Sequence, residues 1–320
     1  MSIWRKKNLE AMLADAANAE KSLKRTLGSF HLVALGIGAI IGAGLFVRTA
    51  SAAAEAAGNG VTLSFLVAAL GCAFAGLCYA EFAAMIPISG SAYAYSFVTM
   101  GELVAWIIGW ALVMEYALGA ATVSIAWSEY LNNLMGGAIP YEWCHSPLES
   151  INYLTGASMD AFVAAHPESV KGIHHGILVL SDEQVKLASE VSTKSGTINA
   201  PALIILFALT LLLIKGTKES AFVNAIIVFL KVAIVLVFIA IGWGFINPEN
   251  HTPYLIPEGI KGHEGIFEWG WGGVLGGAAI VFFAFIGFDA VSTAAQEAKN
   301  PKRDMPIGIL GSLVICTILY

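Results

Sequence analysis

Lys231 is the one charged residue in an otherwise apolar run, AIIVFLKVAIVLVF, that extends from Ala225 to Phe238. It would lie about 15 Å along its helix, in the middle of a hydrocarbon core of about 30 Å. A lysine that faced lipid there would cost at least about 2.5 kcal/mol, so we expect it to face protein or water. Asn224 falls on nearly the same helix face, which directs this polar stripe inward. There the ammonium group can donate to backbone carbonyls, and because burial disfavours its charged form it can also release a proton.

A second apolar run, LGIGAIIGAGLFV, contains Gly36, Gly38, Gly42 and Gly44. Glycine costs up to about 1 kcal/mol in a helix interior, so this run predicts either a small-residue packing face or a local unwinding of the helix. Gly38 and Gly42 form a GxxxG pair, but Gly42 and Gly44 point to different faces, which favours unwinding. Unwound backbone at membrane depth is tolerated where it lines a cavity. Its free N–H groups suit a carboxylate and its free carbonyls an ammonium, as in an amino acid.

A third run, IVFFAFIGFDAVSTAAQEAKNPKRD, repeats this pattern with Gly287 followed by Asp289. An acid inside the membrane is a candidate functional residue. The alternative is that Asp289 caps a helix that restarts after a second break. Two interrupted helices, five spans apart, indicate a transporter built from inverted repeats.

Three glutamates lie in or near apolar runs. Glu115 would lie about 18 Å along its helix, near mid-depth. It is either a partner for a polar group on a neighbouring helix or part of a pocket that meets a basic or polar substrate side chain. Glu129 and Glu81 lie nearer the ends of their helices and can reach water, so we expect no direct role for them.

The composition indicates the class of fold that must position these residues. Of the 320 residues, 57% are hydrophobic and 12% charged, whereas soluble domains carry about 25% charged residues. This predicts an all-α integral membrane protein. A span needs about 20 apolar residues, and we expect seven, at about 31–50, 61–86, 102–134, 198–214, 221–246, 273–295 and 306–320. The last is too short for a full crossing, so we expect the chain to be an N-terminal fragment.

Lysine and arginine residues set the expected orientation, because cytoplasmic segments carry an excess of them. Eleven lie in the segments that would be cytoplasmic when the N-terminus is inside, and five lie outside. Residues 1–30 then form a cytoplasmic segment, residues 31–320 the transmembrane domain, and the 135–197 loop faces outward. The histidines of this loop are expected to be surface residues rather than a metal site; they are His145, His174 and His175.

Four stretches together resemble the amino acid–polyamine–organocation superfamily of transporters: GIGAIIGAGLFV, PISGSAYAYSFV, KGTKES and FFAFIGFDAVSTAAQEAKNPKRDMPIGI. They look most like the bacterial relatives of the cationic amino acid transporters, from about residue 25 to the end. The resemblance implies an inverted-repeat fold of five plus five helices with discontinuous helices one and six. This chain would hold the first repeat and the start of the second. It also implies that the cytoplasmic connector 87–101 packs beneath the transport path, although its own sequence shows only a flexible, amphipathic loop.

The resemblance also implies the substrate-binding groups, residue by residue. The substrate carboxylate would be bound by the backbone N–H groups of Gly42, Ala43 and Gly44, next to Ile41. The substrate ammonium would be bound by the carbonyls of Ile40, Phe283, Ala284 and Ile286. Phe283 matches an aromatic gate, and Gly287 and Asp289 would support the second break. Lys231 stands where sodium-coupled proteins of this architecture hold a sodium ion, so it would replace that ion and can carry the proton. The alternative is a structural lysine that holds helices one, five and eight together.

These features predict secondary active transport of an amino acid, cationic or small and neutral, across the inner (plasma) membrane, coupled to protons and operating by alternating access. One alternative is an exchanger or uniporter without proton coupling, and another is a non-transporting amino acid sensor or a channel. No nucleophile–base pair, metal-ligand pattern or phosphate loop appears at membrane depth, so we expect no enzyme and no cofactor. Nothing indicates a nucleic acid partner.

Overall fold

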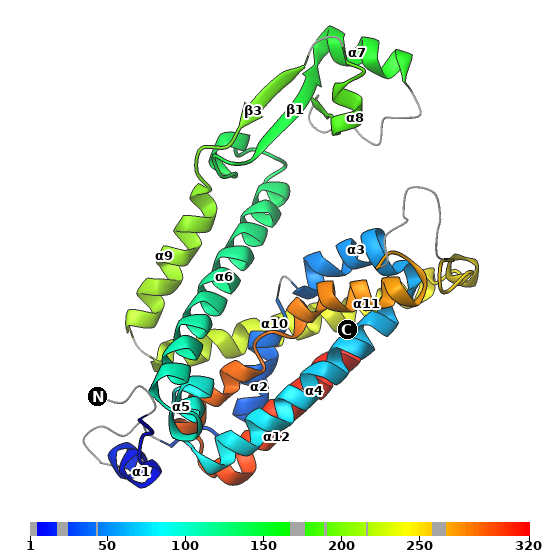
Figure 1. Ribbon diagram of the computed structural model, residues 1–320. Helices are drawn as coiled ribbons and strands as arrows, with labels where there is room; N and C mark the ends of the chain where they lie inside the picture. The colour runs from blue at the N-terminus through cyan, green and yellow to red at the C-terminus, as the bar shows by residue number, and fades with distance from the viewer. Residues whose placement is uncertain are drawn as a thin grey trace. The chain divides into compact units, whose positions relative to one another are not determined.

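The computed structural model describes residues 5–17, 25–42, 44–166, 177–188, 191–215, 217–257 and 267–320 (Figure 1). The chain divides into two compact units. The first comprises Met1–Ala117 and Gly216–Tyr320, and the second comprises Leu118–Lys215. The candidate site lies entirely in the first unit.

The first unit is built from helices. Its longer helices are α1 (Leu9–Ala17), α2 (Ser29–Ile40), α4 (Val61–Met85), α5 (Ser91–Thr99), the start of α6 (Glu102–Leu134), α10 (Thr217–Gly242), α11 (Gly270–Val281) and α12 (Pro301–Leu319). Short helical turns join them: η1 (Gly44–Arg48), α3 (Thr49–Ala52), η2 (Ala53–Ala57), η3 (Gly58–Gly60), η6 (Trp243–Phe245), η7 (Pro248–His251), η8 (Phe282–Phe285) and η9 (Asp289–Glu297).

Four helical stretches of the described residues are long and apolar enough to cross a membrane: Gly44–Met85, Glu102–Leu134, Asn224–Phe245 and Gly270–Glu297. Two shorter apolar helices accompany them, Ser29–Ile40 and Ala200–Ile214. Helices occupy all seven positions predicted for spans, with ends that differ by a few residues. The protein is therefore a multi-pass membrane protein.

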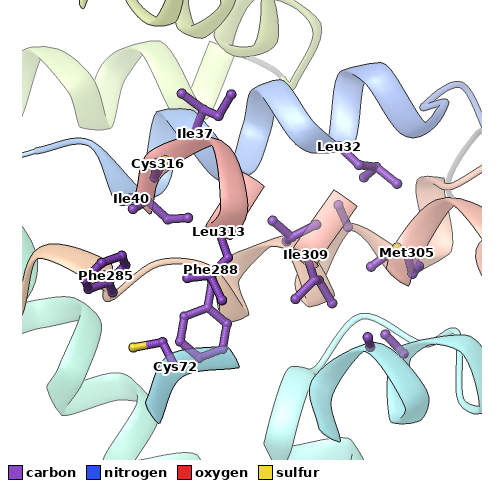
Figure 2. Packing of buried hydrophobic residues seen from close by; sticks show 14 of the residues in the cluster. Leu32, Ile37, Ile40, Cys72, Phe285, Phe288, Met305, Ile309, Leu313 and Cys316 are labelled. Atoms are coloured by element: carbon purple, nitrogen blue, oxygen red, sulfur yellow. The ribbon is translucent and has the colours of Figure 1, made fainter. Parts of the chain in front are cut away.

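The hydrophobic core of the first unit lies where α12 packs against α2 and α4. Figure 2 shows Leu32 of α2 beside Met305 and Ile309 of α12, and Ile40 of α2 beside Cys316 of α12, with Phe285 nearby. Because lipid is as apolar as these side chains, close van der Waals packing rather than removal of apolar surface from water stabilises this core. This core fixes the ends of the two interrupted helices, because Ile40 is the last residue of α2 and Phe285 the last of η8.

The second unit corrects the prediction of an all-α chain. Besides the end of α6 and α9 (Ala200–Lys215), it contains a three-stranded antiparallel sheet in the order β2-β1-β3. The elements of this region are η4 (Tyr141–Trp143), β1 (Ser150–Thr155), α7 (Gly156–Ala165), β2 (Ile177–Val179), α8 (Asp182–Val185) and β3 (Ser192–Ser195). A small separate core of Leu154, Phe162, Leu178 and Leu180 holds them together. Strands of three to six residues give a much weaker hydropathy signal than a span, which is why the sequence predicted only a loop.

The connector 87–101 is a second correction. It was predicted to be a flexible loop, but residues Ser91–Thr99 form α5. The helix starts after Gly90, whose φ of 159° a glycine adopts without strain. Ser91, Ala94 and Tyr95 are buried at helical spacing on one face, so packing against the unit stabilises a helix that is too short to be stable alone.

Candidate functional site

The first break lies between α2 and η1. Helix α2 ends at Ile40, Ile41 has the extended backbone angles φ −71° and ψ 107°, and the next described helical turn begins at Gly44. Gly38 is a packing glycine, because a Cβ built on it would lie 2.7 Å from a methyl group of Val228 on α10. Gly42 instead lies in the break. Both interpretations of the glycine run therefore apply, each to a different glycine; Ala43 lies outside the described residues.

The second break follows η8. Ile286 is extended, with φ −57° and ψ 132°, and Gly287 has φ 118°, which side chains rarely adopt. A Cβ on Gly287 would lie 2.7 Å from the carbonyl oxygen of Ala39, and one on Gly44 would clash with the Cα of Ala284. The two breaks thus pack directly against each other through positions that admit no side chain.

Lys231 lies at the first break. Its Nζ donates to the carbonyl oxygen of Gly38 at 2.7 Å and to that of Ile41 at 2.6 Å. The last carbonyls of a helix have no intrahelical partner, and a cation there also compensates the negative end of the helix dipole. Asn224 faces the same helix, since its amide atoms would lie 3.2–3.3 Å from a Cβ on Gly38. The polar stripe of α10 is therefore directed at α2.

Tyr320 connects the two breaks, and sequence reasoning missed it. Its hydroxyl lies 3.1 Å from the carbonyl oxygen of Ile40 and 3.0 Å from that of Ala284, and can donate to either. Its ring packs edge-on against Phe65 and is tilted against Phe285. The one signal in the sequence was a tyrosine within an apolar run, because a buried hydroxyl usually finds a hydrogen-bond partner.

Asp289 does not cap the restarting helix, which corrects that prediction. Phe288 already has helical angles and occupies the N-cap position, so Asp289 is the first residue of η9. Its carboxylate, 5% exposed, accepts a hydrogen bond of 2.6 Å from the hydroxyl of Tyr116 on α6. No pattern in the sequence singles out Tyr116, which directly follows Glu115.

The remaining predicted residues fall into two groups. Phe283, Ile286 and Glu115 are half-buried, whereas Glu81 and Glu129 are exposed. The carbonyl of Phe283 already accepts from the N–H of Ile286. No heavy atom of the described residues lies within 4 Å of a Cβ built on Gly42, so open space adjoins the first break.

Among the described residues, no group of three or more histidine, cysteine, aspartate or glutamate side chains could hold a metal ion. His145 stacks on Tyr141 with 3.7 Å between ring centroids. His174 and His175 lie outside the described residues.

Two interrupted apolar helices that bring unpaired backbone polar groups together are a feature of membrane transporters built from repeats. The family model described as "Amino acid permease" matches residues 27–320. The chain belongs to this family, within the amino acid–polyamine–organocation superfamily, as its motifs predicted.

Its relatives carry the names of permeases and transporters rather than of enzymes. The chain is 44% identical to the "Branched-chain amino acid permease BcaP" of Bacillus subtilis (strain 168), over 100% of the chain and 57% of that protein. It is 41% identical to the "Methylthioribose transporter" of the same organism, over 100% of the chain and 58% of that protein. It is 34% identical to the "Cationic amino acid transporter 2, vacuolar" of Arabidopsis thaliana, over 96% of the chain and 41% of that protein. The chain thus spans little more than half the length of the two bacterial relatives.

Proposed function

We propose that the complete protein transports an amino acid across the inner (plasma) membrane by alternating access, as a proton-coupled uptake system. The observation that carries this proposal is the contact between the two breaks. Around it lie carbonyls that can accept from an ammonium, open space beside Gly42, and the fixed charge of Lys231. A zwitterion has the two opposite charges that such a pair of helix ends can bind.

The substrate would be bound mainly by backbone. Its carboxylate would accept from the N–H groups of Gly42, Ala43 and Gly44, and its ammonium would donate to carbonyls on both breaks. Tyr320 now holds two of those carbonyls, Ile40 and Ala284. An incoming ammonium would therefore take over or share the place of the Tyr320 hydroxyl.

The side-chain specificity is proposed to be for cationic or small neutral amino acids. The half-buried Glu115 on α6 supports a cationic side chain, and the name of one relative specifies branched-chain substrates. A thermal-shift screen of the twenty amino acids on the complete protein, with methylthioribose included because a second relative is named for it, tests this choice.

The proposal extends to architecture. The interrupted helices α2 and α11 would be the first helices of two inverted five-helix repeats, with the second repeat incomplete in this chain. The N-terminal segment 1–30 would be cytoplasmic and the 135–197 region, which contains the small sheet, would face outward. Residues 31–320 would form the transmembrane domain.

Proton coupling is proposed to involve Lys231. Its two hydrogen bonds support the idea that an ammonium replaces a sodium ion at the first break. Loss of its proton would leave two N–H donors but remove the positive charge, which would weaken the hydrogen bonds to the Gly38 and Ile41 carbonyls and loosen the junction between α10 and α2. The alternative is that the lysine stays charged and only holds the helices together.

Uptake into proteoliposomes containing the complete protein tests these points. We expect labelled amino acid to accumulate when an inward proton gradient is imposed and to stop accumulating when a protonophore collapses it. Accumulation that needs only an internal amino acid would show an exchanger, and equilibration without accumulation would show a uniporter. Binding without any flux would show a sensor, and a conductance without saturation would show a channel; either result would overturn the transport proposal.

A further inference from the structure

Three buried hydroxyl groups lie next to the second break without a hydrogen-bond partner among the described residues. They belong to Ser91 and Tyr95 on α5 and to Ser292 on η9. Their residues are 2%, 5% and 0% exposed. A buried hydroxyl without a partner is costly, so three of them at one place imply a partner outside the described residues.

Helix geometry brings these groups to one seam. Ser91 and Tyr95 are four residues apart on α5 and share a face. Asp289 and Ser292 are three residues apart on η9, which is a 3-10 helix with three residues per turn, so their side chains share an edge. The two elements pack against each other. We call these four residues the polar seam.

The hydroxyls come near partners without reaching them. The Tyr95 hydroxyl faces that of Ser292, and the Ser91 hydroxyl faces that of Tyr79 on α4. Even so, neither serine hydroxyl nor that of Tyr95 meets hydrogen-bond geometry with a described residue. The seam is thus lined by hydroxyls on both sides, which face one another without meeting hydrogen-bond geometry.

The surrounding contacts hold the two residues of α5 in place. The ring of Tyr95 stacks on Phe82 with 5.2 Å between centroids and meets the ring of Tyr79 edge-on at 6.2 Å. Ser91 has φ 48°, a backbone conformation that non-glycine residues rarely adopt.

Asp289 supplies the acceptor that the seam needs. Its carboxylate has about four lone-pair sites, and the one side-chain donor among the described residues is the Tyr116 hydroxyl, at 2.6 Å. A water molecule accepts from a hydroxyl and donates to a carboxylate, and buried waters typically make about three such bonds. Water can therefore form hydrogen bonds with the one carboxylate and the three hydroxyls that have no other partner.

We propose that the polar seam encloses ordered water that bridges the carboxylate of Asp289 to the hydroxyls of Ser91, Tyr95 and Ser292. The water keeps this acid hydrated although it is buried at membrane depth. It also links the segment after the second break to α5. The inference concerns the folded state and holds whether or not the protein transports an amino acid.

Radiolytic hydroxyl-radical footprinting of the complete protein tests it, because radicals formed from an enclosed water label the side chains beside it. We expect Tyr95 to be labelled several-fold more than Phe285, a fully buried ring in the dry core, after correction for intrinsic reactivity. The label should take up ¹⁸O slowly after mixing with H₂¹⁸O, as expected for an enclosed water. Labelling of Tyr95 no stronger than that of Phe285 would overturn the proposal. Labelling that falls in sodium or potassium but not in choline would also overturn it, since a metal cation would then occupy the seam.

Ser292→Ala and Ser312→Ala form a matched pair of variants. Both serines are fully buried, but the Ser312 hydroxyl already donates to the carbonyl of Ile309 at 3.0 Å. We expect S292A to reduce the labelling of Tyr95 several-fold and S312A to leave it unchanged. Unchanged labelling in S292A together with a higher unfolding temperature would show a dry seam. The wild-type footprint decides the question alone if a variant fails to fold.

Discussion

The Nζ of Lys231 lies 2.6 Å from the carbonyl oxygen of Ile41, the first residue after the end of the first interrupted helix. The same ammonium group also holds the carbonyl of Gly38. A side chain 190 residues away in the sequence therefore satisfies backbone groups that the break leaves unpaired. The break and the lysine stabilise each other. The role of the lysine can therefore be tested by measuring both the stability of the protein and its proton coupling.

Replacing Lys231 with methionine keeps most of the side-chain volume and removes the donor. Each stranded carbonyl then costs about 1–3 kcal/mol, so we expect a lower unfolding temperature of the complete protein. We also expect proton-driven accumulation of amino acid in proteoliposomes to be lost. Leu230→Met, at the exposed neighbouring position, is the control and should change neither quantity. If K231M is destabilised but accumulates substrate as before, the lysine is structural and the coupling proposal is wrong.

Replacing Tyr320 with phenylalanine removes the hydroxyl that joins Ile40 to Ala284 and keeps the ring contacts. We expect the substrate-free protein to lose about 0.5–1.5 kcal/mol of stability. A bound ammonium would satisfy the two released carbonyls, so the thermal shift produced by the amino acid should be larger in Y320F than in the wild type.

Tyr254→Phe is the matched control for this hydroxyl. Tyr254 pairs with Thr62 on the first turn of α4 rather than with a carbonyl of either break. It should lower the unfolding temperature without changing the shift produced by the amino acid. An unchanged shift in Y320F as well would show that the Ile40 and Ala284 carbonyls do not bind the substrate.

The ion pair between Glu142 and Lys194 in the second unit predicts a pH dependence. Oε1 of the glutamate lies 3.0 Å from Nζ of the lysine. The backbone N–H of Glu142 and then Lys194 donate to the carboxylate and lower the pKa of Glu142 below its ordinary value. Its contribution to stability is therefore present above the unfolded pKa of about 4.3 and is lost as the pH falls through the folded value.

Hydrogen exchange measures this effect at the N–H groups of Thr197 and Ile198, which donate to the carbonyl of Glu142. We expect their protection, corrected for intrinsic exchange, to decrease at acid pH. In the Glu142→Gln variant these two N–H groups should be less protected at neutral pH, and acidification should not reduce their protection further. The effect is small because both side chains are largely solvated. An equal loss of protection on acidification in the wild type and in E142Q would show that another group causes the pH dependence.

The sequence predicted the parts of this structure that one segment determines by itself. The positions of the apolar helices follow from hydropathy, because unsatisfied backbone cannot face lipid. The interruptions near Gly42 and Gly287 follow from residues that helices disfavour. Lys231 was predicted to face inward because a lysine that faced lipid would be costly. Family membership was predicted from the motifs, and the family match confirms it.

The sequence did not predict contacts that only tertiary packing creates. The hydroxyl of Tyr320 meets a carbonyl 280 residues away, and that of Tyr116 meets an acid 173 residues away. That Asp289 caps its own helix was the alternative to a functional role, because Asp is common at that position. The backbone restarts one residue earlier, and the carboxylate binds α6 instead. The local preference of aspartate for the N-cap was overridden by its contact with Tyr116, which lies too far away in the sequence for a local pattern to reveal.

Gly287→Ala tests whether the second break requires the backbone conformation of Gly287. The φ of 118° is unfavourable for alanine, and the new Cβ would lie 2.7 Å from the carbonyl oxygen of Ala39. Strain of this kind costs about 1–3 kcal/mol, so we expect a clearly lower unfolding temperature and weaker amino acid binding. Gly71→Ala is the control, because Gly71 lies inside α4 with open space around its Cβ position and alanine is the better helix former by about 1 kcal/mol. It should be neutral or stabilising. Equal unfolding temperatures for G287A and G71A would mean that the chain after η8 can adopt another path, and the direct packing of the two breaks would then not be needed for the fold.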